Sequence, residues 1–375
     1  MSTIKTNAIL DASGGNTTTI NGTTPTAYNT MGKNRIINGA MEIDQRNAGS
    51  AATVTNDYVL DRFKIFEQTD GAISTQQVTT VPAGFKNSMK ITVTTADSSL
   101  AANQLTSIFQ PIEGLNCTDL SWGTSDAKTV TLSFWVRSSL TGTFGGCLVN
   151  GAVDRSYVFQ YTVNSADTWE QKSITVAGDT SGTWLTTNGV GVYVLWSLGD
   201  GTDYQGTANA WQAGSKRSAS GNVNLLGTNG ATFYITGVQL EVGSVATEFE
   251  RRPYGTELAL CQRYYQHSYA TGTAVGTATS VGAAHFGGGQ NGSTTGYLAG
   301  PWILFPVQLR TFPTITVWDI GGNSGVCHRF TYAVGGANSQ SYSIAATSDK
   351  SIYGYSSGST NYAGVSIHWR AEAEL

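Results

Sequence analysis

The run ITGVQLEVG at residues 235–243 constrains the fold of this chain more than any other feature. It has the composition of a buried strand, and it stops before the charged, proline-containing stretch FERRPY at 249–254. Proline has no backbone N–H to donate to a β-ladder, so the strand cannot continue through Pro253. We therefore expect a joint here between two β-rich parts.

The composition favours an all-β fold. Charged residues make up 12% of the 375 residues, and 45 residues are glycine, which supplies the positive-φ positions of short hairpins. Long runs of strong helix formers are almost absent. The length suits two domains and an extension. We predict an extended N-terminal arm at 1–31, a jelly-roll β-sandwich at 32–253, a linker helix at 254–266 and a small C-terminal β-sandwich at 267–375.

Charge and hydropathy exclude two classes of partner. The formal net charge is −4 and the basic residues are scattered, whereas a surface that binds nucleic acid needs clustered Lys and Arg. No apolar stretch approaches the roughly 20 residues of a membrane helix, so we expect no membrane insertion. The first residues also lack the apolar core of a signal peptide, which predicts synthesis in a cytoplasm without export by the usual route.

Short runs in which apolar and polar residues alternate recur along the chain, separated by the turn-forming residues Gly, Asn and Asp. This period of two predicts half-buried antiparallel strands at 89–94, 130–137, 157–163, 172–176 and 189–198. About eight such strands fit a two-sheet jelly roll. In the C-terminal part we predict strands at 302–309, 314–318, 329–334, 341–346, 350–355 and 364–372. The one credible helix spans 255–265, with Thr256 as its cap.

The N-terminal arm is polar and rich in turn signals. Such a segment buries too little apolar surface to order itself, so we expect another protein or further copies of this chain to hold it. The candidate anchoring residues are Ile4, Leu10, Ile20 and Tyr28.

Two short motifs follow the arm. The first, NRIINGAMEIDQRN at 34–47, predicts a strand with Gly39 at a bend, and the second is YVLDRF at 58–63. In this order they resemble the opening of fibre and appendage proteins of tailed bacteriophages. The run at 235–254 resembles the end of the jelly-roll domain of such proteins and of related carbohydrate-binding modules. Residues 305–316 and the final Ala-Glu-Leu resemble the C-terminal module of marine-phage appendage proteins.

Paired carboxylates are the main enzymatic alternative, because glycan depolymerases on phage fibres use two of them. The candidate pairs are Asp57 with Asp61, Asp200 with Asp203, and Glu248 with Glu250. Each has a simpler structural interpretation, namely a strand start, a turn and the charged joint. No nucleophile elbow, Walker loop or HExxH motif is present. We therefore predict no catalytic residues and no enzymatic activity.

Metal and thiol chemistry are weakly indicated. Cys117, Cys147, Cys261 and Cys327 are widely spaced without a CxxC pair, which predicts buried free thiols in place of disulfides or zinc ligands. By the fibre resemblance, His267 and His285 are candidates for a metal site on a trimer axis, although no HxH pair occurs. Carbohydrate-binding jelly rolls often hold a structural Ca²⁺. We predict no cofactor and leave a structural Ca²⁺ and its ligands open.

Aromatic residues are the candidates for binding sugars, because their rings stack on sugar rings. Strand parity places Trp135, Tyr193 and Tyr234 opposite the core-facing residues of their strands. We predict that these three line one concave sheet face. Trp184, Tyr204 and Trp211 are alternatives in loops. A competing interpretation is that another strand, the arm or a neighbouring subunit covers this face.

The resemblance implies a structural protein on the surface of a tailed-phage virion, made in the cytoplasm of a host bacterium. It implies a homotrimeric tail fibre that the arm attaches to other virion proteins and that contacts host-surface glycans through several weak sites. One alternative is a head fibre or capsid decoration (cement) protein that stabilises the shell. A second is a stand-alone glycan-binding protein or depolymerase.

Overall fold

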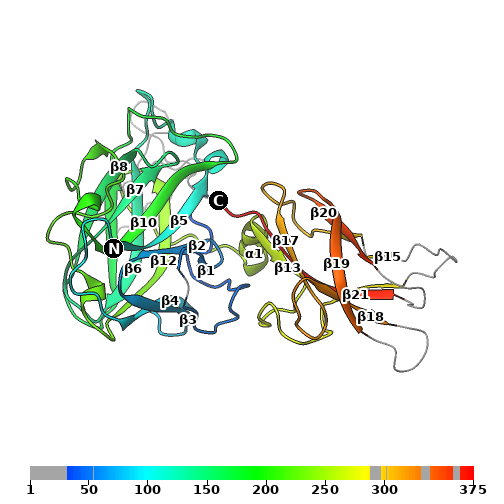
Figure 1. The fold of residues 1–375 in the computed structure, drawn as a ribbon. Coiled ribbons are helices and arrows are strands. Elements are labelled where there is room, and N and C mark those ends of the chain that lie inside the picture. Colours follow the sequence, from blue (N-terminus) through cyan, green and yellow to red (C-terminus); the bar gives the residue numbers. More distant parts are fainter. Residues whose placement is uncertain (1–31, 54, 288–296, 301, 331–337, 358–363) are drawn as a thin grey trace, which may run out of the picture.

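The computed structural model describes residues 32–53, 55–287, 297–300, 302–330, 338–357 and 364–375. A two-sheet sandwich and a third sheet lie on either side of helix α1 (Tyr254–Gln262), as Figure 1 shows. The predicted all-β fold is confirmed. The anchoring candidates Ile4, Leu10, Ile20 and Tyr28 lie outside the described residues.

The sandwich consists of a seven-stranded and a five-stranded antiparallel sheet. The first runs in the order β1 (Tyr58–Leu60), β2 (Phe63–Gln68), β5 (Leu105–Glu113), β10 (Val190–Asp200), β7 (Gly142–Asn150), β8 (Arg155–Val163) and β11 (Trp211–Ala213). The second runs β3 (Ala72–Val78), β4 (Ser88–Thr95), β12 (Thr232–Val242), β6 (Val130–Ser138) and β9 (Glu170–Val176). From β4 to β7 successive strands alternate between the sheets, as in a jelly roll.

The core between these sheets is formed by every second residue of the strands, because side chains alternate between the two faces of a sheet. Most inward residues of the alternating segments are buried, while Ile174 of β9 is partly buried against the core. Phe134 of β6 packs edge-on against Trp196 of β10 with ring centroids 5.6 Å apart. Burial of each such side chain contributes roughly 1.5–3 kcal/mol. The five strands predicted in this part of the chain are confirmed. Short 3-10 turns connect several strands at η1 (Gly114–Asn116), η2 (Thr118–Leu120), η3 (Thr202–Tyr204) and η4 (Leu225–Gly227).

The motif at 34–47 is not a strand, contrary to the prediction. Side chains provide several of its backbone partners: the Ile37 N–H donates to Gln110 Oε1, and Gln110 Nε2 donates back to the Ile37 carbonyl. Two single backbone bonds to β12, from Arg35 N–H to the Leu240 carbonyl and from Val238 N–H to the Gly39 carbonyl, do not form a ladder. Gly39 lies in a turn against β12, where an added Cβ would come within 2.2 Å of the Val238 carbonyl oxygen. The motif therefore encodes a close contact with the 235–243 run.

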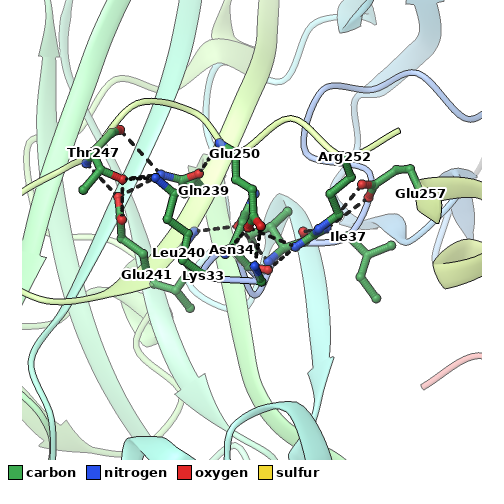
Figure 2. Close-up of polar contacts among 12 residues, drawn as sticks. Lys33, Asn34, Ile37, Gln239, Leu240, Glu241, Thr247, Glu250, Arg252 and Glu257 are labelled. Atoms are coloured by element: carbon green, nitrogen blue, oxygen red, sulfur yellow. Dashed lines mark hydrogen bonds and ion pairs between the residues drawn. The ribbon is translucent and has the colours of Figure 1, made fainter. Parts of the chain in front are cut away.

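A buried polar network fixes this contact, as Figure 2 shows. Asn34 Nδ2 donates to the Val238 carbonyl (3.1 Å), and its Oδ1 accepts from the Leu240 N–H (3.1 Å). Glu250 accepts from the Asn34 N–H (2.7 Å), and Arg252 donates to carbonyl oxygens of residues 34 and 36. The charged residues of the joint thus provide hydrogen-bond partners for the backbone of the motif at 34–47.

The third sheet contains β13 (Tyr265–His267), β14 (Ala284–Gly287), β15 (Tyr297–Ala299), β16 (Ile303–Leu304), β17 (Thr314–Trp318), β18 (Val326–Phe330), β19 (Asn338–Thr347), β20 (Ser351–Ser357) and β21 (Gly364–Glu372). Strand β21 pairs with β13, β14, β17 and β18. The predictions for 314–318 and 364–372 match β17 and β21. The strand predicted at 302–309 is limited to Ile303–Leu304, since Pro306 has no N–H to donate. Residues 331–334 of the strand predicted at 329–334 lie outside the described residues.

The linker differs from the prediction at both ends. Helix α1 has Pro253 at its N-cap with no side-chain cap, so Thr256 lies within the helix. The helix ends at Gln262 because Tyr265 already pairs with Glu372 as part of β13.

Ion pairs join the sandwich to the third sheet across this linker. Arg46 donates to Glu372 (3.1 Å) and Glu374 (2.6 Å), Arg62 pairs with Glu374, and Arg263 pairs with Glu113 (2.7 Å). The pairs at Arg46 and Arg62 are almost fully shielded from water, so removing either partner would leave a buried charge. The end of the chain is also fixed here: the Tyr58 hydroxyl donates to the Leu375 carbonyl (2.9 Å).

The predicted burial of the four cysteines is confirmed. Among the described residues, no group of three or more His, Cys, Asp or Glu side chains is placed to hold a metal ion. Within the same residues, no helix combines the length and the apolar character of a membrane span.

Candidate functional site

The outer face of the seven-stranded sheet carries a row of side chains across five strands, and all of them except a lysine are apolar. The register places Lys64, Phe109, Leu195, Cys147 and Val158 side by side on β2, β5, β10, β7 and β8. Because side chains alternate along a strand, all five point away from the sandwich core. A neighbouring row contains Pro111, Tyr193 and Val149.

The segment 201–224 covers one end of this face and leaves the other end open. Cys147 and Val158 are fully buried beneath the covered end, where they cluster with Ala219 of the segment. Beside them is a cavity of about 180 Å³, lined by Lys64, Phe66, Phe109, Val149, Val153, Tyr193, Leu195, Ser215, Arg217 and Leu375. This is smaller than the roughly 300–1,000 Å³ of pockets that enclose drug-sized ligands. It suits one ring of a longer molecule lying along the sheet.

Aromatic rings and one free hydroxyl define what the cavity can bind. The rings of Phe109 and Tyr193 meet edge to face with centroids 5.8 Å apart, and Phe66 lies on the adjacent strand. All three are partly exposed. Ser215 Oγ is buried without a hydrogen-bond partner in the described structure. Flat apolar rings beside an unsatisfied polar atom can accept a ring with both C–H and O–H groups.

Two cations complete the lining. The Arg217 guanidinium lies 5.4 Å from the centroids of both Phe66 and Tyr204, so it makes cation–π contacts with both rings. Lys64 Nζ lies 5.9 Å from the centroid of Phe109. The predicted loop residue Tyr204 is therefore adjacent to the cavity through Arg217, although it is not part of the lining.

Asp200, at the end of β10, interacts electrostatically with Arg217. Burial raises the pKa of its carboxyl group to about 6, against the opposing effects of the Ser197 and Ser218 hydroxyls and of Arg217. Neither carboxylate oxygen accepts a well-formed hydrogen bond within the described structure. At neutral pH this carboxylate is thus a buried charge with little compensation.

The structure corrects the predicted grouping of the outward aromatic residues. All three point away from the core as predicted, but β10 carries Tyr193 on the seven-stranded sheet, whereas β6 and β12 carry Trp135 and Tyr234 on the five-stranded sheet. The alternation of residues along a strand predicts which side chains point outward. It does not predict to which of the two sheets the strand belongs. Tyr193 therefore lies on the opposite side of the sandwich from Trp135 and Tyr234.

Of the candidates predicted in loops, Trp211 instead begins strand β11, where it pairs with Tyr157 of β8. Together with Trp184 it belongs to a cluster with Trp122. The three rings meet edge to face with centroid separations of 4.7 to 5.3 Å. Each indole N–H donates to a backbone carbonyl, at Ser181 for Trp184 and at Ala177 for Trp211. These contacts are those of a packing cluster, so Trp184 and Trp211 are weaker candidates for ligand contact than Tyr193.

The carboxylates considered for catalysis have structural partners or lie in solvent. Asp61 is buried and accepts from the Gln45 backbone (2.7 Å) and side chain (2.5 Å), while Asp57 is exposed at the start of β1. Glu250 accepts from the Asn34 N–H, and Glu248 is exposed. None of these side chains lines the cavity.

Sequence reasoning missed Phe66, Phe109, Lys64, Arg217 and Ser215 in the site. The signal for Lys64 and Phe66 was present, because burial alternates along residues 63–68 as in the strands that were recognised. Residues 105–113 (LTSIFQPIE) do not alternate, so no period of two marks Phe109. Arg217 and Ser215 lie in an irregular segment, where no periodicity indicates which side chains return to the sheet.

Comparisons with known proteins gave structural neighbours only. No protein-family model matches the chain, and no curated protein matches it. A putative sugar-binding protein from Bacteroides thetaiotaomicron is 11% identical with a TM-score of 0.31, covering 56% of this chain and 100% of its own. A family 11 carbohydrate-binding module from Clostridium thermocellum, solved with a β-1,3-1,4-mixed-linked tetrasaccharide, is 10% identical with a TM-score of 0.28, covering 52% and 98%.

The enzymatically active domain of tailspike protein 4 from bacteriophage CBA120 is 10% identical with a TM-score of 0.29, and the match covers 56% of this chain. The chain spans only 21% of the length of that tailspike structure. Identities and TM-scores are low for all three neighbours, so none of them assigns a function to this chain.

Proposed function

We propose that this protein binds glycans without cleaving them, through the cavity on the outer face of the seven-stranded sheet. The observation that carries the proposal is the combination of Phe66, Phe109 and Tyr193 with the unpartnered Ser215 hydroxyl on one open sheet face. Aromatic rings contact the C–H face of a sugar while polar atoms meet its hydroxyls. The sheet gives these side chains a rigid base, which lowers the entropic cost of binding.

A glycan array tests this proposal directly. Labelled protein should bind a limited set of glycans, and calorimetry should give weak affinities, with Kd on the order of 10 µM to 1 mM, as expected for a shallow one-ring site. Release of reducing ends from the bound glycans should match that of a buffer control. Absence of binding across the array would reject glycan binding, and steady release of reducing ends would reject the non-catalytic assignment.

The finer part of the proposal concerns where the protein acts. We propose that it is a homotrimeric surface fibre of a tailed-phage virion, attached to other virion proteins through residues 1–31 and presenting its glycan sites to a host bacterium. The support is the ordered resemblance of the motifs at 34–47, 58–63 and 235–254. The exposed Trp302 (63%), Leu304 (71%) and Phe312 (69%) also offer apolar surface for self-association.

Two measurements test this placement. Light scattering after size exclusion should give the mass of three chains, and a variant lacking residues 1–31 should keep that mass but fail to enter particles. Incorporation of the truncated protein would contradict the anchoring role. Labelling of virions seen by electron microscopy separates the tail-fibre proposal from the head-fibre or capsid-decoration alternative, and a protein found only free would favour the stand-alone glycan-binding alternative.

A further inference from the structure

The cavity has two cations without anionic partners. In the described part of the chain, neither Lys64 nor Arg217 forms an ion pair, whereas eight other arginines pair with Asp or Glu. Both cations lie over aromatic rings, which position the charge without neutralising it. Most lysines of the described chain also lie outside ion pairs, so the distinguishing feature of this cavity is that two such cations line one small hollow.

The lining side chains also include no Asp or Glu. Leu375 also borders the cavity. The carboxylate that interacts electrostatically with Arg217, Asp200, is buried and forms no ion pair with it. The side chains that line the cavity thus carry two positive charges and no negative one.

Arg251 provides a useful contrast. It too lies over two rings, those of Phe85 and Phe249. Three glutamates line the hollow that it borders, however, namely Glu42, Glu250 and Glu257. A stacked arginine in this chain can therefore border a hollow lined by acidic side chains, which the cavity beside Arg217 lacks.

We propose that the ligand of this cavity is an acidic sugar, held with its anionic group between Lys64 and Arg217 and its ring against Phe109 and Tyr193. This inference rests on the proposed glycan-binding function and narrows it to one class of glycan. A guanidinium presents paired N–H donors that match a carboxylate, sulfate or phosphate, and such charge-assisted hydrogen bonds are about twice as strong as neutral ones. Ser215 Oγ is left for a ring hydroxyl.

Matched pairs of polysaccharides isolate the charge. Polygalacturonate, alginate and hyaluronan are compared with their carboxyl-reduced forms, which keep the linkages and lose the charge, and dextran sulfate is compared with dextran. We expect binding of at least one acidic member, at least about tenfold tighter than that of its neutral form, as one charge-assisted contact provides. Binding should also weaken when the ionic strength rises to about 0.5 M.

Variants assign the effect to the two cations. Arg217→Gln and Lys64→Gln should each reduce affinity for the acidic glycan about tenfold and leave affinity for the neutral form unchanged. The controls are Arg251→Gln, which removes a stacked arginine elsewhere, and Lys90→Gln, which removes a lysine over Tyr234 on the five-stranded sheet. Both change the net charge equally and should leave binding unchanged. Circular dichroism melting checks that each variant is folded.

The outcomes separate the two claims. Equal or tighter binding of the neutral forms, or equal losses in the test and control variants, overturns the acidic-sugar inference and leaves glycan binding in place. Failure of the wild-type protein to bind any member of the panel or of the glycan array overturns the proposed function and this inference with it. An acid-specific affinity that depends on Arg217 and Lys64 but not on Arg251 and Lys90 supports both.

Discussion

The outer faces of the two sheets differ in how their charged groups are used. On the five-stranded sheet, Arg137 of β6 pairs with Asp167 (3.0 Å). The Arg137 guanidinium also lies 4.9 Å from the Tyr234 ring centroid, and that tyrosine is 8% exposed. On the seven-stranded sheet, the segment 201–224 walls a cavity whose two cations have no carboxylate partner among the described residues.

This difference shows that an outward aromatic residue is not by itself a binding residue. Tyr234 contacts Arg137, Lys90 and Trp169, so its ring faces are already in use. Tyr193 contacts Phe109 through an edge and leaves ring surface toward the cavity. A sheet face becomes a candidate site when a neighbouring segment shapes a hollow and leaves its polar groups unsatisfied.

The largest difference in glycan affinity between variants of the two sheet faces should come from removing one aromatic ring. We expect Tyr193→Ala to weaken glycan binding about thirtyfold, equivalent to about 2 kcal/mol, because it removes a ring from the floor of the cavity. Trp135→Ala removes a larger ring from the five-stranded face and should leave binding within twofold of wild type. Calorimetric titration of the array-selected glycan measures both.

Melting curves for the two variants ensure that folded proteins are compared. If Trp135→Ala weakened binding as strongly as Tyr193→Ala, the ligand would lie on the five-stranded face and the assignment of the site would be wrong.

A second contrast concerns pH and stability. Asp200 has a folded pKa raised by burial from 3.8 to about 6, so its contribution to stability is complete below pH 3.8 and is lost as the pH rises through 6. Asp200→Asn mimics the neutral form. Relative to wild type, this variant should gain stability between pH 4.5 and about 7, by on the order of 2 kcal/mol. Urea unfolding at a series of pH values gives the difference.

Glu170 on the five-stranded sheet supplies the opposite case. Burial raises its pKa, but hydrogen bonds from Lys172, Ser165 and Asn164 outweigh burial and lower it to about 2. Its stabilisation is present above pH 4.5 and is lost only as the pH falls through 2. The stability difference between Glu170→Gln and wild type should therefore stay constant from pH 4.5 to 7. A flat difference for Asp200→Asn as well would show that its carboxyl group is not destabilised by burial.

Much of the sandwich followed from periodicity. The segments at 130–137 and 189–198 became strands because alternation with one buried side has few other solutions in a glycine-rich, helix-poor chain. The motif at 34–47 looked like a strand because Ile36, Ile37, Met41 and Ile43 are apolar and buried. Several of its backbone partners are side chains of residues distant in sequence, such as Gln110, and no local pattern reveals such pairing.

The site was less accessible from sequence for a topological reason. Which of the two sheets receives a strand depends on pairings between segments about 50 to 140 residues apart, such as β10 with β7 and β12 with β4. The cavity also depends on where segment 201–224 returns to the sheet, which its irregular sequence does not encode locally. The motifs at 34–47 and 235–254, which carry part of the family resemblance, meet in the joint of Figure 2, so they report on architecture and not on the ligand.

The smallest effect should come from filling the cavity without removing a ring. Ser215→Trp places a bulky side chain in a cavity of about 180 Å³ and should weaken glycan binding about tenfold, or about 1.4 kcal/mol, by excluding the sugar. The matched variant Gln171→Trp adds the same side chain at an exposed position of β9, opposite Trp135, and should not change affinity. Titration of both with one glycan completes the comparison. Tighter binding by Ser215→Trp would mean that the new indole stacks on the ligand, so that the sugar lies over the rim of the cavity and not within it.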